Sequence, residues 1–537
     1  MKRLTLLFAL GVAALAAACS GGGSSSTPPP PTGGFTLASL KGNFAFSMSG
    51  EDPFQGTFIT RAGSFIADGN GNITSAIEDV GDGAQTATVT FSPGTYTMQA
   101  NGKGTITFPA AVGGGLLLNF SMSNAAPNGG GLLIQADGNA TSSGSFNQQN
   151  LSSFTQPFAA ATYVFDFSGT DLTNGFPVSI VGEVATNGAG SVGPGTEDVN
   201  DGGAAAPSGP LTIASGGSVM PDNSAGNNAN FGRSTITFGG NTFALYPIDQ
   251  THAKFIEIDG AALTSGDSFQ QTGTIPTQQN FTSSFISLTG GSNVNINVGG
   301  AVTRALRFTP DGTGNLNTVL FDQNAQKSDG TGSHSCVDPS GGCSLSVMAA
   351  TYTITGSASP GRGTLSITLN GQGAAVDDVF YIASPTLGVI QDVSLNIVAD
   401  GSMLGQAGNI ATSGNFVFNL TGQVAPSGGN VGGEEDIVGQ YALSGTTITR
   451  ASDLIELGST SNHNIAPTDV ATSGTSNTNG DGTKRNSLQL VFTPQSGPAA
   501  KRNFIAYVGG SPPQLMLIGT DSADIDVGTV LTQTTPQ

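Results

Sequence analysis

The sequence predicts an all-β protein made of four tandem antiparallel modules of about 120 residues each. Glycine accounts for 80 of the 537 residues, a frequency that disfavours helices and supplies turns. In addition, four alternating strands of similar sequence recur along the chain, and a glycine-rich turn returns after three of them. Such self-similarity at a nearly fixed period is typical of a repeat architecture.

Each module opens with a strand in which large apolar side chains alternate with small or polar ones before a closing glycine. A period of two places the apolar side chains on one face, as a half-buried strand requires. These opening strands are expected at 44–50, 163–169, 285–290 and 416–422. The modules that they begin are expected at 40–150, 158–272, 281–408 and 411–534.

A tight turn rich in Asp, Asn and Gly links two strands of each of the first three modules. It begins at Asp68, Asn187 and Asp311, and such residues supply the positive φ angles that hairpins need. In all three copies an acid follows 11 residues after the first turn residue, at Asp79, Asp198 and Asp322. The fourth copy has only a shorter turn, Ser444-Gly445-Thr446-Thr447.

A single basic residue also marks the same place in every module, at the start of a later strand. The four are Lys103, Arg233, Arg362 and Arg485. The chain has only 16 Lys and Arg residues, so four equivalent placements indicate a shared role.

Eight strands are expected in the first module, mostly joined by short turns that imply an antiparallel meander. Their expected ranges are 43–49, 55–67, 72–79, 86–99, 103–109, 115–122, 130–136 and 140–148. Closing such a meander removes the exposed strand edges that open sheets would leave. We therefore predict an up-and-down barrel of the lipocalin or avidin type in each module, with a two-sheet β-sandwich as the alternative.

Residues 1–18 have a basic start, a short apolar run and small residues before Cys19, which is the pattern of a signal peptide. The segment Leu15-Ala16-Ala17-Ala18-Cys19 resembles the leader of bacterial lipoproteins, which implies acylation of Cys19. By the same resemblance, Ser20 implies an outer-membrane location, on the periplasmic face or the cell surface. An ordinary secretory cut at the same bond is the alternative. Residues 19–39, rich in Gly, Ser and Pro, are expected to form a tether.

The charge balance excludes nucleic acid as a partner. The chain has 16 basic and 36 acidic residues, whereas phosphate contacts need clustered Lys or Arg. The sequence also lacks a His-Glu-x-x-His motif, a G-x-S-x-G elbow and a P-loop. Carboxylate pairs could serve a glycosidase, but a chain without Trp is poorly suited to stacking sugars. We therefore expect no enzyme activity and no cofactor.

An acidic rim is expected at one end of each module, where the meander gathers its acidic turns and strand ends. Clustered carboxylates could bind Ca²⁺ or a cationic partner, although the simpler interpretation is a set of solvated turn residues, and no metal is predicted. The candidate residues are Glu78, Asp79, Asp137, Glu197, Asp198, Asp259, Asp322 and Asp400.

Cys336 and Cys343 are expected to form a disulfide, the default for two nearby cysteines in an exported protein. Zinc is the weaker alternative, because only His334 stands near them.

Residues 40–534 resemble the tandem β-repeat lipoproteins of unknown function found in bacterial genomes. The turns at Asp68, Glu78-Asp79 and Asp137-Gly138 carry this resemblance, which implies no activity. The first functional hypothesis is a lipid-anchored, non-enzymatic interaction or structural array that contacts the membrane only through its lipid and recognises a protein or a glycan. The alternative is a protein that holds a small apolar ligand inside its barrels. Large side chains such as Phe165 and Phe167 should fill the interiors, which favours the first hypothesis.

Overall fold

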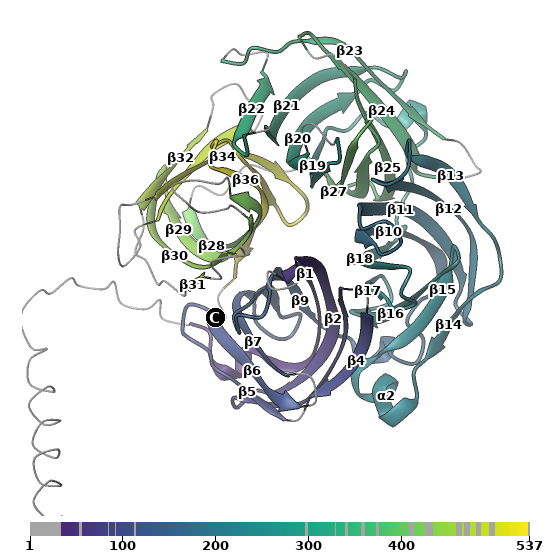
Figure 1. Ribbon diagram of the computed structural model, residues 1–537, viewed down its shortest axis with the longest axis vertical. Helices are drawn as coiled ribbons and strands as arrows, with labels where there is room; N and C mark the ends of the chain where they lie inside the picture. Colours follow the sequence, from purple (N-terminus) through teal and green to yellow (C-terminus); the bar gives the residue numbers. More distant parts are fainter. Residues whose placement is uncertain are drawn as a thin grey trace, which may run out of the picture.

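The structure, a computed structural model, consists of four β-barrels arranged as a ring (Figure 1). It describes residues 34–534 except 53–55, 84, 92, 112–113, 296–298, 328, 339–341, 356–359, 372–374, 407–412, 425–432, 458–463, 467–472, 479–484 and 493–499. The expected signal peptide, the acylation site Cys19 and most of the expected tether lie outside the described residues. Within the described part of the chain, no helix is both long and apolar enough to cross a membrane.

The strands of the first two barrels follow one pattern. The first barrel contains η1 (Leu37–Ser39), β1 (Lys41–Asp52), β2 (Thr57–Asp68), β3 (Asn72–Asp82), β4 (Gln85–Phe91), β5 (Gly94–Tyr96), β6 (Lys103–Ala111), β7 (Gly114–Asn124), β8 (Gly130–Gln135) and β9 (Thr141–Gln148). The second follows η2 (Leu151–Ser153) and contains β10 (Ala160–Asp171), β11 (Pro177–Asn187), β12 (Ser191–Asp201), β13 (Ser208–Ile213), β14 (Gly217–Pro221), η3 (Ser224–Gly226), α2 (Asn227–Phe231), β15 (Ser234–Phe238), β16 (Asn241–Pro247), β17 (His252–Glu257) and β18 (Ala262–Gln270).

The third and fourth barrels repeat this pattern of strands. The third follows η4 (Gln278–Asn280) and contains β19 (Phe285–Asn293), β20 (Gly300–Pro310), β21 (Leu316–Gln326), β22 (Gly332–Val337), β23 (Val347–Ile354), β24 (Arg362–Leu369), β25 (Val376–Ser384), β26 (Leu387–Asp392) and β27 (Ile397–Gly405). The fourth contains β28 (Ser413–Val424), β29 (Gly433–Ser444), β30 (Thr447–Leu457), β31 (Asn464–Ala466), β32 (Ser473–Thr478), β33 (Arg485–Phe492), β34 (Ala500–Gly509), β35 (Gln514–Gly519) and β36 (Asp524–Gln533).

Each sheet is an antiparallel meander that closes its first strand onto its last, as β1 pairs with both β2 and β9. The fourth strand of the expected eight is broken in two, and in the first barrel both halves, β4 and β5, pair with β3. In the third barrel a bridge from Asn315, the residue before β21, to Thr351 of β23 takes the place of the β3–β5 pairing. The barrel prediction is therefore confirmed, and the sandwich alternative is excluded.

The barrel interiors are filled by aromatic and aliphatic side chains from alternate strand positions. In the second barrel the Phe165 and Phe167 rings stack with their centroids 4.9 Å apart, and an interior space of only about 10 Å³ remains beside Phe165. Gly182 faces Phe165 on the adjacent strand, where a Cβ would overlap the ring. The missing side chain thus makes room for the phenylalanine.

Outward-facing side chains of each barrel pack against the next barrel around the ring. The first two strands of one barrel contribute Ala45 and Ala62, or in the last barrel Val417 and Val438. The facing residues come from the later strands of the neighbouring barrel. The buried clusters join barrels 1 and 2, 2 and 3, 3 and 4, and finally 4 and 1, so the chain closes on itself.

Candidate functional site: barrel junctions and a central cavity

The acids expected 11 residues after the turns lie buried at three of the junctions, where each bonds an arginine and a tyrosine of the next barrel. At the first junction, Arg233 Nε and Nη2 each donate to Asp79 across 2.8 Å, and Tyr246 Oη donates across 2.6 Å. The same contacts join Asp198 to Arg362 and Tyr381, and Asp322 to Arg485 and Tyr507. We call these three groups the junction triads.

Burial and charge fix the protonation states in the triads. Burial alone would lower the pKa of Arg233, but the hydrogen bonds and charge of Asp79 raise it above its usual value. Burial, and then the negative charge of Asp79, raises the pKa of Tyr246 far above its usual value. The arginine is therefore charged and the tyrosine is a neutral donor. The same directions hold for Arg485 and Tyr507.

A glutamine at the end of the last strand, or directly after it, makes a second repeated contact. The Nε2 group of Gln149 donates to the carbonyl oxygens of Phe231 and Pro247 in the next barrel. Gln271 does the same to Pro360 and Ile382. In the last barrel, Gln533 donates to Asn101 and Met122 of the first barrel. This contact therefore runs across the ring closure as well.

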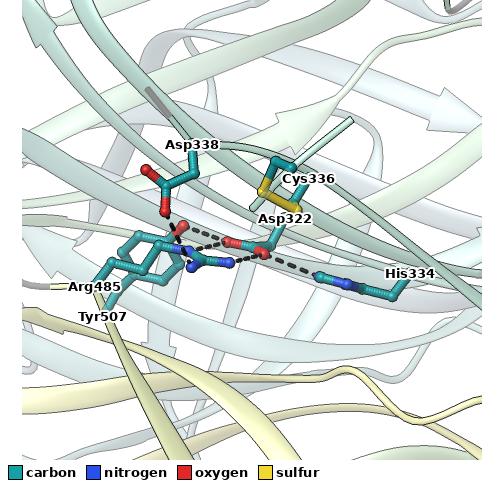
Figure 2. The surroundings of a disulfide bond; sticks show 7 residues. Asp322, His334, Cys336, Asp338, Arg485 and Tyr507 are labelled. Atoms are coloured by element: carbon teal, nitrogen blue, oxygen red, sulfur yellow. Dashed lines mark hydrogen bonds and ion pairs between the residues drawn. A yellow bond between two sulfur atoms is a disulfide. The ribbon is translucent and has the colours of Figure 1, made fainter. Parts of the chain in front are cut away.

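The disulfide between Cys336 and Cys343 is formed, as expected, and it lies at the third junction (Figure 2). Cys336 stands opposite Asp322 in the β21–β22 pairing. His334 Nε2 lies 2.9 Å from Asp322, and Asp338 accepts a bond from Arg485 Nη1 at 3.4 Å. The disulfide thus ties a segment that surrounds the junction triad.

A metal at this place is not supported by its donors. Asp322, His334 and Cys336 have potential ligand atoms within 4.8 Å of one another. The Cys336 sulfur, however, is bonded to Cys343, and both Asp322 oxygens accept bonds from Arg485. Asp322, His334 and Cys336 are therefore structural residues of the third junction.

The other acids of the expected rim lie in different settings. Glu78 is buried in the first barrel, where it pairs with Arg61 at 2.8 Å and burial raises its pKa. Burial, and then the charge of Asp198, raises the pKa of Glu197 to about 7. Asp137 and Asp259 accept backbone bonds in their own turns.

These acids accordingly do not share one solvated rim. The expectation treated each module as isolated, whereas the neighbouring barrel covers the outer face of β3 and of its equivalents. That neighbour turns Asp79, Asp198 and Asp322 into buried partners of arginine.

Asp400 lines a cavity of about 530 Å³ on the ring axis, to which all four barrels contribute. Its walls include the ends of β1, β10, β19 and β28, with the closing glycines Gly169, Gly290 and Gly422. A Cβ at Gly169 or Gly422 would overlap a carbonyl oxygen of the last strand of the same barrel. The glycines recognised in the sequence thus allow the strands to approach closely beside the cavity.

The cavity has a mixed lining of polar, acidic and apolar residues. It includes Ser49, Ser168 and Thr421 and the acids Glu51 and Asp400, together with apolar residues such as Val398, Ile525 and Val527. Burial, and then the charge of Asp52, raises the pKa of Glu51. Burial raises the pKa of Asp400 to about 6, against a lowering effect of its hydrogen bond with Asp166. The Asp166–Asp400 pair comes from two barrels, and its raised pKa values favour one shared proton.

Comparison with known proteins gives no family. No family model and no curated protein matches the chain. Among solved structures, transferrin binding protein B from serogroup B Neisseria meningitidis is 7% identical, with 80% of this chain and 84% of that chain covered and a TM-score of 0.19. A putative AttH from Nitrosomonas europaea is 8% identical, with 71% and 96% covered and a TM-score of 0.16. Scores this low support no conclusion about fold or activity, so the resemblance to β-repeat lipoproteins stays a prediction.

Proposed function

We propose that the chain is a non-enzymatic protein of the bacterial envelope, held at the outer membrane by a lipid on Cys19. Its four barrels act together as one scaffold that presents exposed loops, such as 203–206, to a protein or glycan partner. The observation that carries the proposal is the ring closure. Buried contacts between all neighbouring barrels turn four small domains into a single body, as a display scaffold requires.

The alternative, a small apolar ligand inside each barrel, is not favoured by the packed interiors. Ligand pockets usually span about 300 to 1,000 Å³, whereas the space within the second barrel is about 10 Å³. The central cavity, about 530 Å³, is large enough for a small ligand. Its hydroxyl and carboxylate groups would contact the polar part of such a ligand and its apolar side chains the rest, so a binding function in addition to scaffolding is best sought on the ring axis.

The mature chain is expected not to bind an apolar fluorescent probe such as N-phenyl-1-naphthylamine. Since aromatic side chains occupy the interiors, titration of the dye should leave its fluorescence within the range given by an equal mass of a protein without a cavity. Saturable enhancement that approaches one dye per barrel would replace the scaffold proposal with the ligand-carrier alternative.

Replacing Cys19 by serine is expected to release the protein from membranes. Acylation contributes about 0.8 kcal/mol for each buried CH₂ group, and the serine variant cannot carry the chains. The measurement is the fraction that sediments with membranes after a carbonate wash. The double variant Cys336→Ser/Cys343→Ser is the control and should still sediment. An unchanged distribution of Cys19→Ser would contradict the lipid anchor.

A further inference from the structure

The central cavity is accessible to a small molecule from one end of the ring. Its lining includes Gly56 and Gly175, two exposed residues in the β1–β2 and β10–β11 turns. The described chain enters the ring at the opposite end, because β1 starts at Lys41 and advances about 3.3 Å per residue before it reaches Glu51 beside the cavity. The expected tether therefore joins the ring away from the opening of the cavity.

Three carboxylates line this cavity, and no lysine or arginine stands among its described lining residues. Glu51 comes from the first barrel, Asp400 from the third and Glu434 from the fourth. At the junction triads, by contrast, an arginine of the next barrel bonds each acid. The cavity therefore has a negative potential, which the net charge of -20 on the whole chain strengthens.

Asp400 belongs to an acid pair whose hydrogen bonding is incomplete. It bonds Asp166 and Ser168 of the second barrel. Asp166, Ser168 and Thr170 alternate along β10 and share one face of the strand, and Ser168 and Thr170 line the cavity. Asp166 Oδ1 is buried, yet it has no hydrogen-bond partner among the described residues. Because native proteins rarely leave a buried acceptor without a donor, this end of the cavity lacks hydrogen-bond donors.

Apolar side chains flank Asp400. Val398 precedes it by two residues on β27 and shares its face. Val527 of the fourth barrel packs against Gly290, the residue that pairs with Asp400, so closely that a Cβ there would lie 2.8 Å from Val527 Cγ2. A molecule beside Asp400 therefore meets a negative charge and an apolar surface together.

These surroundings do not suit a bare metal ion. In the described part of the chain, the one group of three side chains with ligand atoms close enough for a metal lies at the third junction, not in the cavity. The cavity volume of about 530 Å³ is that of a site for a small organic molecule.

We propose that the central cavity binds a small organic ammonium ion. Its positive group contacts Asp400 and donates hydrogen bonds to the acid pair, and its apolar body packs against Val398 and Val527. This inference gives a ligand class to the binding function on the ring axis and does not depend on the lipid anchor or on the display of loops. Its failure would leave the scaffold proposal intact, because the Cys19→Ser measurement tests the anchor separately.

Three probes of the same size and different charge test the proposal: 4-phenylbutylamine, 4-phenylbutanol and 4-phenylbutyrate. Isothermal titration of the full mature chain at pH 8, above the Asp400 pKa of about 6, measures their binding. The amine should bind saturably at a single site and at least about tenfold more tightly than the alcohol, because an ammonium close to a carboxylate gains Coulomb energy. The butyrate should not bind. Absence of saturable amine binding, or equal affinities of amine and alcohol, would overturn the proposal.

Asp400→Asn assigns the charge preference to the cavity. The variant should weaken amine binding at least about tenfold and leave the affinity for the alcohol unchanged, because the amide keeps the shape of the side chain but not its charge. Asp259→Asn is the matched control, since it removes an exposed carboxylate outside the cavity lining, and it should change neither affinity. Equal weakening of the amine by both variants would mean that the overall negative charge attracts it, which would refute the site.

Should Asp400→Asn fail to fold, Ser49→Trp provides a second test. Ser49 is an exposed residue of the cavity lining, so the larger side chain can be placed there without entering a barrel interior. The indole should occupy the cavity and abolish saturable binding of the amine. Unchanged amine binding in the folded Ser49→Trp variant would locate the binding outside the cavity and contradict the proposal.

Discussion

Replacing Asp198 by asparagine is expected to lower the free energy of unfolding by about 3 to 5 kcal/mol, the usual effect of removing one partner from a buried ion pair. Asp198 accepts two bonds from Arg362, at 2.8 and 2.6 Å, and one from Tyr381 at 2.6 Å. Arginine cannot lose its proton in a protein, so the variant leaves a charged guanidinium buried beside a neutral amide. Urea unfolding followed by tyrosine fluorescence measures the change, because the chain has no tryptophan.

Two further variants test whether the loss of stability comes from the buried ion pair. Tyr381→Phe removes only one hydrogen bond to a charged group and should lower the free energy of unfolding by about 1.5 to 3 kcal/mol. Asp259→Asn removes an exposed carboxylate of the same barrel and should change it by less than about 0.5 kcal/mol. A loss at Asp198 no larger than that at Asp259 would mean that the triad does not hold barrels 2 and 3 together.

The barrel fold was predictable because the sequence signals for its strands and turns are local. Alternation in Phe44, Phe46 and Met48 marks a half-buried strand, and the turn at Asp68 marks a hairpin, each within a few residues. Eight such strands joined by short turns leave few topologies, and closure follows from the need to remove edges. The break between β4 and β5 was not predicted, although the pair Pro93-Gly94 lies at it and such a pair is a usual turn signal.

The junctions were not predicted, because their partners are distant in the chain. Asp79 and Arg233 are 154 residues apart, and the acid of one copy meets the arginine of the next. The repeat alignment nevertheless carries a signal. The acid occurs at this position in copies one to three, whereas arginine occurs in copies two to four, with Lys103 in the first. The acid and the arginine are thus offset by one copy. This offset is expected when the acid of each barrel contacts the arginine of the next barrel.

The stability of the protein is expected to fall as the pH rises from about 5 to 8, a trend set by buried carboxyls with raised pKa values. Burial is the main cause at Asp436, with a pKa of about 7, at Asp378, also about 7, and at Glu257, about 8. These groups are protonated in the folded chain at pH 5 and ionised when it unfolds, so the folded state binds more protons. Each then removes about 1.4 kcal/mol per pH unit up to its folded pKa.

Asp436, at the junction of the fourth and first barrels, allows this trend to be assigned to a single group. Its carboxyl accepts the bond from Ser143 in the first barrel, with Thr421 beside it and Glu435 next to it in the chain. Asp436→Asn keeps the shape and an acceptor but cannot ionise. It should therefore flatten the slope between pH 5 and 7 by about 1.4 kcal/mol per unit and make the protein more stable than the wild type at pH 8.

Urea midpoints at pH 5.5 and pH 8 for both proteins provide the measurement. The pKa of Asp322 is shifted in the opposite direction, so this residue affects the pH dependence of stability differently. Burial would raise its pKa, but the bonds from His334 and Arg485 lower it, so its stabilisation is present above pH 4 and is lost only in stronger acid. It therefore adds no slope between pH 5 and 8. Equal slopes in the two proteins would show that Asp436 is ionised in the folded chain at pH 5.5, and the closure would then hold a charge that its contacts with Ser143 and Thr421 must stabilise.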